Sequence, residues 1–258
     1  MSNSLISTVR DLKLKRGRER RGLALAEGVR LVEEAHAAGL EFRGAVVGPA
    51  LEATARGKSL KAALTAAGVR LHDVPSDQLA ELADTDHPQG IIAVIAPPRW
   101  SLDHIAMRPR DTVLVLDAVQ DPGNVGTLAR TAFGLGARGV IALAGTAELT
   151  NPKVLRAGMG ATFRFPCVAA DVSEFGAWAA QQSASVWLAA ADGEPLDRGQ
   201  RPERLALVVG NEGAGISDAV ARLAHRSVSI PLAEGSESLN VAAAAAVCLY
   251  ESMRRRGQ

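Results

Sequence analysis

TVLVLDAVQDPGNVGTLARTAFGLGARGVIALAG, residues 112–145, contains two apolar runs separated by a segment of helical character. The run TVLVLDAV is rich in valine and leucine, as buried strands are, and the run VIALAG is similar. The segment between them opens on a turn, DPGN, and continues with the period of a helix. Two strands joined by a helix form a β-α-β unit, and its strands run parallel. The stretch therefore predicts a parallel sheet, with the turn after the first strand at the carboxyl edge, where ligands usually bind.

The same stretch contains a literal G-x-G-x-x-G pattern at Gly134, Gly136 and Gly139. In a dinucleotide-binding fingerprint these glycines directly follow the strand, where the pyrophosphate meets the helix N-terminus. Here they lie at the far end of the predicted helix, where Gly134 and Gly136 are expected to form the C-cap and the turn. This position argues against a nicotinamide-dependent oxidoreductase.

The composition is that of a globular protein with a sizeable apolar core. The chain has 258 residues, 47% of them hydrophobic, and a formal net charge of +1, so any affinity for nucleic acid must come from local patches. Cys167 and Cys248 lie in apolar surroundings far apart in the sequence, which favours buried free thiols, and no metal is expected. No secretory signal and no run of roughly 18 apolar residues is present, so we expect a cytoplasmic protein without a membrane partner.

Two domains are predicted from the alternation of strand-like and helix-like segments. Residues 1–97 alternate runs such as LALAEG, FRGAVVG and GIIAVIA with helical segments such as VRLVEEAHAAG and the capped helix SDQLAELADT, which predicts a small α/β domain. Residues 98–110 contain proline and lack a clear period, which is typical of a linker. Residues 111–258 alternate again, with strands near TVLVLDAV, GVIALAG, FRFPCVA, VWLAAA, LALVVGNE and RSVSIPLA. They predict a mostly parallel sheet covered by helices on both faces.

Three loops of the second domain carry polar candidates at the expected carboxyl edge of the sheet. In the first loop, Asn124 is a plausible N-cap residue, and Arg130 follows six positions later on the helix. Glu212, in VVGNEGAGIS, argues against a polyphosphate and for a ligand with hydroxyl, amine or sulfonium groups. Ser238 and Asn240 precede an alanine-rich helix. The alternative is purely structural: caps, a surface cation and a first-turn helix charge, with the alanine run suited to a subunit interface.

A basic run, KLKRGRERR, covers residues 13–21. It is either a solvated helix face or a set of phosphate contacts, since cations that displace counterions supply most sequence-independent affinity for nucleic acid. On the second interpretation, the RNA-binding residues are Lys13, Lys15, Arg16, Arg18, Arg20 and Arg21.

Three motifs in order resemble the signature motifs of the SpoU (TrmH-type) RNA 2′-O-ribose methyltransferases. They are N-x-G-x-x-x-R from Asn124 to Arg130, GNEG at 210–213, and IPL followed by SLNV from Ile230 to Val241. The segments AEGVRLVEEA and DTDHPQGIIAV also resemble the substrate-binding domain that precedes the catalytic domain in the larger rRNA-directed members. The ordered set is far more specific than any one motif.

The resemblance implies a SPOUT-type fold, a parallel-sheet α/β domain with a deep trefoil knot, after a small α/β (L30e-like) N-terminal domain. It implies a homodimer that binds S-adenosylmethionine as its cofactor. By position, the main-chain groups of Gly210, Ile230 and Leu239 would hold the cofactor, and the loop after VWLAAA, around Ala190, is a further candidate for the same pocket. A deep knot is not expected from general topology rules.

The resemblance also assigns roles at the reacting centre to Asn124, Arg130, Glu212, Ser238 and Asn240. The family's proposed activator of the ribose hydroxyl would be Arg130. A guanidinium stays protonated in proteins and is a poor base, so we expect it to stabilise a developing alkoxide or to hold an RNA phosphate, and its action as a base stays open. The implied activity is 2′-O-ribose methylation of RNA, with large-subunit ribosomal RNA as the expected partner. A tRNA-directed enzyme, a resistance methylase and a non-catalytic RNA-binding module of the same fold stay open as alternatives.

Overall fold

The structure is a computed structural model that describes residues 2–198, 200–233, 235 and 238–254. The chain forms two compact units, which are described separately. The N-terminal unit contains residues 1–99 and 150–164, and the C-terminal unit contains residues 100–149 and 165–258. The chain therefore passes between the units three times. The predicted domain boundaries of 1–97, 98–110 and 111–258 stay a prediction.

The N-terminal unit has a four-stranded sheet of order β1-β4-β2-β3. Strand β4 pairs antiparallel with both β1 and β2, whereas β2 and β3 are parallel. Its elements are α1 (Ser2–Leu12), α2 (Lys15–Arg21), β1 (Ala24–Glu27), α3 (Val29–Ala37), β2 (Glu41–Val47), the 3-10 helix η1 (Pro49–Ala53), α4 (Ala55–Ala66), β3 (Leu71–Asp73), α5 (Ser76–Leu82), β4 (Ile91–Ala96), α7 (Pro152–Gly158) and α8 (Ala161–Arg164). The predicted α/β character is confirmed, but α5 has Pro75 at its N-cap and no side-chain cap.

Helices cover both faces of this sheet. Helices α3 and α4 bury residues such as Leu31 and Leu60 against one face. Helices α1 and α5 cover the other, where Val9 and Leu82 pack on alternate strand residues. Helix α1 was not predicted from the sequence, although its buried Ile6, Val9 and Leu12 recur at helical spacing.

The C-terminal unit has a six-stranded, all-parallel sheet of order β10-β8-β9-β5-β6-β7, which confirms the predicted sheet type. Its elements are η2 (Leu102–His104), β5 (Thr112–Leu116), α6 (Pro122–Gly134), β6 (Val140–Ala142), β7 (Cys167–Ala169), α9 (Val172–Gln181), β8 (Ser185–Pro195), β9 (Leu205–Val209), α10 (Asp218–Ala221), β10 (Arg226–Ser229) and α11 (Val241–Arg254). The trefoil knot stays a prediction from the family resemblance.

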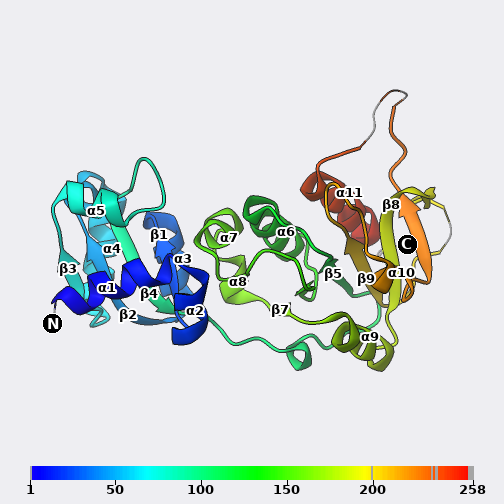
Figure 1. The fold of residues 1–258 in the computed structure, drawn as a ribbon, viewed down its shortest axis with the longest axis horizontal. Helices are drawn as coiled ribbons and strands as arrows, with labels where there is room; N and C mark the ends of the chain where they lie inside the picture. The colour runs from blue at the N-terminus through cyan, green and yellow to red at the C-terminus, as the bar shows by residue number, and fades with distance from the viewer. Residues whose placement is uncertain (1, 199, 234, 236–237, 255–258) are drawn as a thin grey trace. The chain divides into compact units, whose positions relative to one another are not determined.

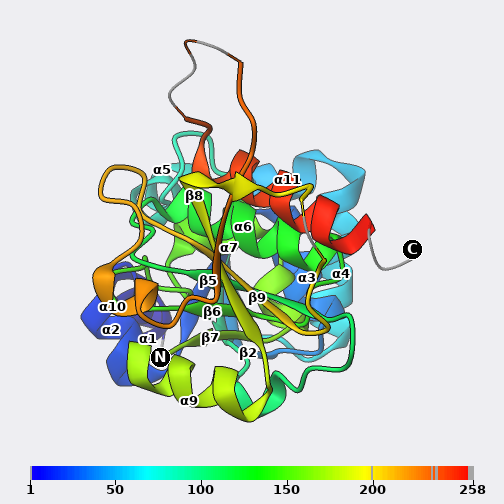
Figure 2. The same cartoon turned by 90° about the vertical axis from the view of Figure 1, so that its right-hand side faces the viewer.

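Both faces of the parallel sheet are covered, as continuous apolar strands require. Helices α6 and α11 pack together on one face, and α9 lies on the other (Figure 2). Phe175 and Trp178 of α9 share a core with alternate residues of the strands. The segment predicted as a linker contributes to this core, since Ile105 is buried and its carbonyl accepts a hydrogen bond from the Trp178 indole.

The end of α6 explains the glycine pattern in the opening stretch. Gly136 has the left-handed φ of 79°, and the N–H of Ala137 bonds back to the carbonyl of Ala132, so the helix ends in the manner expected of a glycine C-cap. Gly134 is the last helical residue rather than the cap, which is Leu135. Among the described residues, no helix combines the length and the apolar character that a membrane crossing requires.

Candidate active site

The three candidate loops follow strands β5, β9 and β10, which end at Leu116, Val209 and Ser229. Because all strands of this sheet are parallel, the loops leave the same carboxyl edge. Helix α11 follows the third loop and packs against α6, β5, β8 and β9.

The first loop starts α6 with a cap that differs from the predicted one. Asp121 is the N-cap residue, and its Oδ1 accepts the N–H of Asn124 at 2.7 Å. Pro122 takes the first helical position, where its missing N–H costs nothing. Asn124 lies inside the first turn, so its amide is not used as a cap and is available to other loops.

The second loop is held by its own polar groups and by the first strand. The main chain of Asn211 forms a two-way bridge with Gly215, at 2.9 and 3.0 Å. Its Oδ1 accepts two N–H groups of the turn, and its Nδ2 donates to the carbonyl of Ala118 at 3.0 Å. The buried carboxylate of Asp117 accepts the N–H of Ser217 at 2.6 Å. These contacts fix the loop that carries Glu212.

Asn240 begins α11, as the sequence predicts for a capping residue. Its Oδ1 accepts the N–H of Ala242 at 2.9 Å, and its carbonyl accepts the N–H of Ala244. With the amide oxygen used by the helix, the Nδ2 group is turned toward α6.

A chain of hydrogen bonds then joins the three loops. Asn240 Nδ2 donates to Asn124 Oδ1 at 3.2 Å, and Asn124 Nδ2 donates to Glu212 Oε1 at 2.7 Å. The carboxylate can only accept, and the Asn240 oxygen is already used by α11, so each amide has one orientation that satisfies both ends. The second oxygen of Glu212 accepts no hydrogen bond from any described residue. This chain of hydrogen bonds forms one wall of the candidate site, and the second carboxylate oxygen of Glu212 lies at its end.

Two other predicted residues are not joined to this chain. Arg130 is exposed on α6, and no described residue forms a hydrogen bond or an ion pair with its guanidinium. Ser238 is exposed before α11 and has no hydrogen bond within the described part of the chain. Both side chains are therefore exposed to solvent and have no partner among the described residues.

The residues predicted to hold the cofactor share unpaired main-chain groups. Across the described residues, no hydrogen bond uses the main-chain N–H or C=O of Gly210, Ile230 or Leu239. At Gly210 an added Cβ would lie 2.4 Å from the carbonyl oxygen of Gly215, so only glycine fits. The prediction for Ala190 needs correction, because it lies within strand β8 and not in a loop. Strand β8 continues past VWLAAA and pairs with β10 through a register shift.

Two of the predicted RNA-binding cations are used inside the N-terminal unit. Arg18 is 5% exposed, and its guanidinium donates to the carbonyls of Leu12 and Lys13, both at 2.9 Å. The Lys13 ammonium donates to the carbonyls of Glu81 and Ala83, at 3.2 and 2.8 Å. The Arg18 side chain is therefore not available at the surface.

The other four cations of the basic run are exposed. Arg20 and Arg21 both bind the carboxylate of Asp11, at 2.7 and 2.6 Å. The Lys15 ammonium lies 3.7 Å from the carboxylate of Glu19. The remaining residue, Arg16, forms no hydrogen bond or ion pair with a described residue. The run is thus partly neutralised by its own unit.

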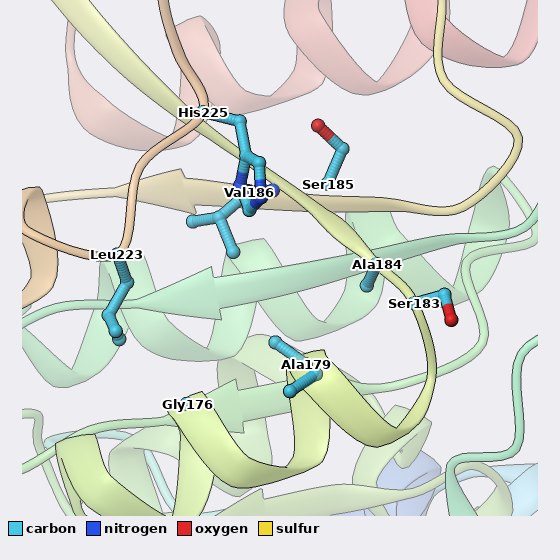
Figure 3. Close-up of a pocket in the computed structure, with 9 residues that line it drawn as sticks. Gly176, Ala179, Ser183, Ala184, Ser185, Val186, Leu223 and His225 are labelled. Atoms are coloured by element: carbon cyan, nitrogen blue, oxygen red, sulfur yellow. Dashed lines mark hydrogen bonds between the residues drawn. The ribbon is translucent and has the colours of Figure 1, made fainter.

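A separate pocket of about 430 Å³ lies at the amino end of β8, not at the edge of the three loops (Figure 3). It is lined mainly by small and apolar side chains, and His225 is its one titratable residue. The Nδ1 atom of His225 accepts the N–H of Val186 at 3.1 Å, so this histidine has a structural role. The pocket lacks the polar groups of the candidate site.

Three residues that support the site were missed in the sequence: Asp117, Asp121 and Asn211. For Asp121, the aspartate–proline pair before a helix is a known N-cap pattern that could have found it. Asp117 directly follows a buried strand, but nothing in the sequence relates it to Ser217. The role of Asn211 depends on the turn itself.

Comparison with known proteins gives the family. Residues 111–250 match the model described as the SpoU rRNA Methylase family. The chain belongs to the SpoU rRNA methylase family. Residues 3–93 also match the MRM3-like substrate binding domain. The three loops described above lie within the residues that match the SpoU family.

Relatives and solved structures cover nearly the whole chain of this SpoU-family protein. It is 32% identical to 23S rRNA (guanosine(2553)-2′-O)-methyltransferase RlmP of Bacillus subtilis, over 96% of this chain and 95% of the relative. The SpoU methyltransferase AviRb of Streptomyces viridochromogenes, solved with AdoMet, aligns with a TM-score of 0.86 at 27% identity, over 97% of this chain and 98% of that one. An AdoMet-bound rRNA methyltransferase of Sinorhizobium meliloti aligns with a TM-score of 0.85 at 29% identity, over 99% and 96%.

Proposed function

We propose that this chain is an enzyme that transfers a methyl group from S-adenosylmethionine to the ribose 2′-oxygen of a nucleotide in large-subunit ribosomal RNA. The observation that carries the proposal is the hydrogen-bonded chain of Asn240, Asn124 and Glu212, which joins the three signature loops. The proposal is supported by relatives named as 23S rRNA 2′-O-methyltransferases in Bacillus subtilis and Streptomyces viridochromogenes.

The residues present fit S-adenosylmethionine. The unpaired main-chain groups of Gly210, Ile230 and Leu239 offer both donors and acceptors, as an adenine edge and an amino-acid end require. The carboxylate of Glu212 favours a ligand with positive charge over a polyphosphate. When bound, the cofactor supplies a methyl carbon attached to a positively charged sulfur. The chain's own residues then have to hold and align the ribose.

The polar residues of the site divide the remaining work. The hydrogen bonds that link Asn240, Asn124 and Glu212 hold the amide of Asn124 in one orientation. This pre-organised wall positions the ribose. The unpaired guanidinium of Arg130 stabilises the charge that develops on the 2′-oxygen, or holds the neighbouring phosphate. The free hydroxyl of Ser238 contacts the ribose.

The N-terminal unit holds the RNA. Its match to a substrate-binding domain supports this role, and the exposed Arg16 and Lys15 are the best placed of the six predicted cations. Arg20 and Arg21 contribute once RNA phosphates compete with Asp11, whereas the buried Arg18 shapes the unit from inside. The protein works in the cytoplasm, where its two free cysteines stay reduced.

The active form is a homodimer. Its proposed interface contains α11 and α6, because the large apolar side chains of Phe133, Val247 and Tyr250 are exposed there. Sedimentation of the wild type should give about twice the mass of one chain. A Val247→Glu/Tyr250→Glu double variant should shift to the monomer, and a wild type that sediments as a monomer would contradict the dimer.

The function is tested by methyl transfer and by cofactor binding. Tritiated S-adenosylmethionine should label deproteinised ribosomal RNA and not tRNA, and Arg130→Ala and Asn240→Ala should each lower the rate by about a hundredfold or more. Full activity in both variants would remove these residues from the mechanism. No detectable binding of S-adenosylmethionine by calorimetry would leave an RNA-binding module, and labelling of tRNA alone would change the substrate.

A further inference from the structure

The N-terminal unit has a pocket of about 190 Å³ to which both of its recognisable sequence motifs contribute. The turn between β1 and α3, within AEGVRLVEEA, forms one side, and the segment before β4, within DTDHPQG, forms another. Helix α7 and its C-cap residue close the pocket, although the sequence places them between β6 and β7. The lining residues are Glu27, Gly28, Arg30, Leu31, Thr85, His87, Gln89, Arg156 and Met159.

The walls of this pocket are fixed by hydrogen bonds, most of them to a buried carboxylate. Glu27 is 6% exposed, and its two carboxylate oxygens accept the N–H groups of Asp84 and Thr85, at 2.8 and 3.2 Å, and the Thr85 hydroxyl. Gln89 accepts the N–H of Val29 at 2.9 Å through Oε1. The loop before β4 is thus tied to the start of α3, and the pocket is preformed.

Two basic side chains on the pocket wall have no partner among the described residues. Arg30 and His87 are exposed, and neither side chain forms a hydrogen bond or ion pair with a described residue. Arg156 is paired on one side, with Nη2 2.6 Å from Asp84 Oδ2. Its Nη1 is buried, lies 3.5 Å from Glu27 Oε2, and makes no hydrogen bond. Arg156 therefore offsets one of the two carboxylates, and the exposed guanidinium of Arg30 has no ion-pair partner among the described residues.

The N-terminus of α3, which borders the pocket, also has main-chain donors. In α3 the first N–H to bond within the helix is that of Val32, which donates to the carbonyl of Gly28. The N–H groups of Arg30 and Leu31, both lining residues, have no hydrogen-bond partner among the described residues. N–H groups at the start of a helix and a guanidinium, none of them paired within the described residues, are the donors that bind the acceptor oxygens of a phosphate.

We propose that this pocket binds one phosphate of the RNA backbone and so fixes the position of the RNA on the N-terminal unit. The inference rests on the proposed function, because it takes RNA as the partner. Phosphate contacts set position and orientation and carry no base sequence, which suits a site built from a guanidinium and main-chain N–H groups. The volume of about 190 Å³ admits a phosphate with part of its ribose and is too small for a base-paired RNA helix.

The test is RNA binding without methyl transfer. Affinity of the full chain for deproteinised 23S rRNA is measured at several salt concentrations for the wild type and for Arg30→Ala. Loss of one phosphate contact should lower the slope of log affinity against log salt by about 0.7 to 0.9 and weaken binding about 5- to 8-fold at 0.1 M salt. Because the Arg30 side chain forms no hydrogen bond or ion pair with a described residue, the melting temperature of the protein should not change in Arg30→Ala.

Arg70→Ala is the matched control, since Arg70 is an exposed arginine of the same unit outside the pocket. It should lose clearly less affinity than Arg30→Ala. Equal losses in both variants, or wild-type affinity and slope in Arg30→Ala, would overturn the phosphate site. A wild type that binds RNA but transfers no methyl group would instead overturn the proposed function and leave this test intact.

Discussion

At the scale of single residues, Asn240 has two roles that one pair of substitutions separates. Its oxygen caps α11 and its Nδ2 orients Asn124. In Asn240→Ala both are lost, so the free energy of unfolding should fall by about 0.5–2 kcal/mol and methyl transfer by about a hundredfold. Asn240→Asp keeps a capping oxygen but has no N–H to donate, so stability should stay within about 0.5 kcal/mol while transfer falls as far.

Denaturant unfolding and initial rates of methyl transfer measure the two effects. If Asn240→Asp retained the wild-type rate, the hydrogen bond to Asn124 would have no part in positioning the substrate. If Asn240→Ala kept the wild-type rate of methyl transfer but was less stable, Asn240 would act only as a helix cap.

The two thiols give a prediction for pH. Burial raises the pKa of Cys248 to about 11 and also raises that of Cys167. An unfolded thiol ionises near pH 8.5, so above that pH the unfolded state loses protons first, and stability should fall as the pH rises toward 11. At pH 8 a thiol reagent should label neither cysteine in the folded protein and both in denaturant; rapid labelling of the folded protein would contradict their burial.

Candidate residues for the site could be named from the sequence, and the hydrogen bonds between them could not. Asn124, Glu212 and Asn240 stand out because polar residues follow buried strands or precede a helix. Their hydrogen bonds join positions 88 and 116 residues apart, and such contacts depend on how the strands are ordered. The cap of α6 was misassigned to Asn124 because Asp121 and Asn124 are both good capping residues.

At the scale of elements, the loop at 210–217 makes a prediction about glycine. Gly210→Ala would place a Cβ 2.4 Å from the carbonyl oxygen of Gly215, so the loop must move. We expect a loss of about 1–3 kcal/mol in stability and the loss of cofactor binding. Gly213→Ala is the control in the same loop, because a Cβ added there would lie 3.6 Å from its nearest neighbour, Asn211 Oδ1, which is ordinary van der Waals contact.

Thermal unfolding and calorimetry with S-adenosylmethionine compare the two variants. The two variants should differ clearly in stability and in cofactor binding. If both alanine variants bound the cofactor equally well, the close approach of Gly210 and Gly215 would not matter for the site.

Elements with a clean period were predicted, and two with mixed patterns were not. Helix α1 was missed because its apolar residues precede a basic run, although Val9 and Leu12 are fully buried. Strand β8 was ended too early because its last residues are polar. Those residues pair with the edge strand β10 alone, where a continuous apolar run is not needed.

At the scale of the whole molecule, the segment at 150–164 belongs by packing to the N-terminal unit. Leu155 and Phe163 are buried in the core that α3 and α4 form. Leu155→Ala should therefore destabilise the N-terminal sheet by about 2–5 kcal/mol. Leu14→Ala, at an exposed leucine of the same unit, should change it by less than about 0.5 kcal/mol.

Hydrogen exchange of the main-chain amides in β1 and β4 measures this effect directly. Faster exchange confined to the C-terminal sheet would place the segment in the other unit. The sequence could not reveal this packing, because residues 150–164 lie within the stretch that matches the methylase family. Only long-range contacts show which core the segment joins.

The most direct measurement of the central claim is the position of the transferred methyl group. In RNA, the ribose 2′-hydroxyl attacks the neighbouring phosphate in alkali and so cleaves the strand. A 2′-O-methyl group blocks this attack, so alkali cannot cleave the RNA after a methylated ribose. After transfer from tritiated S-adenosylmethionine to large-subunit ribosomal RNA and alkaline hydrolysis, the label should be found in an alkali-resistant dinucleotide. The amount should fall about a hundredfold with Asn240→Asp. Label in mononucleotides, which marks methylation of a base, or no label at all, would contradict the account.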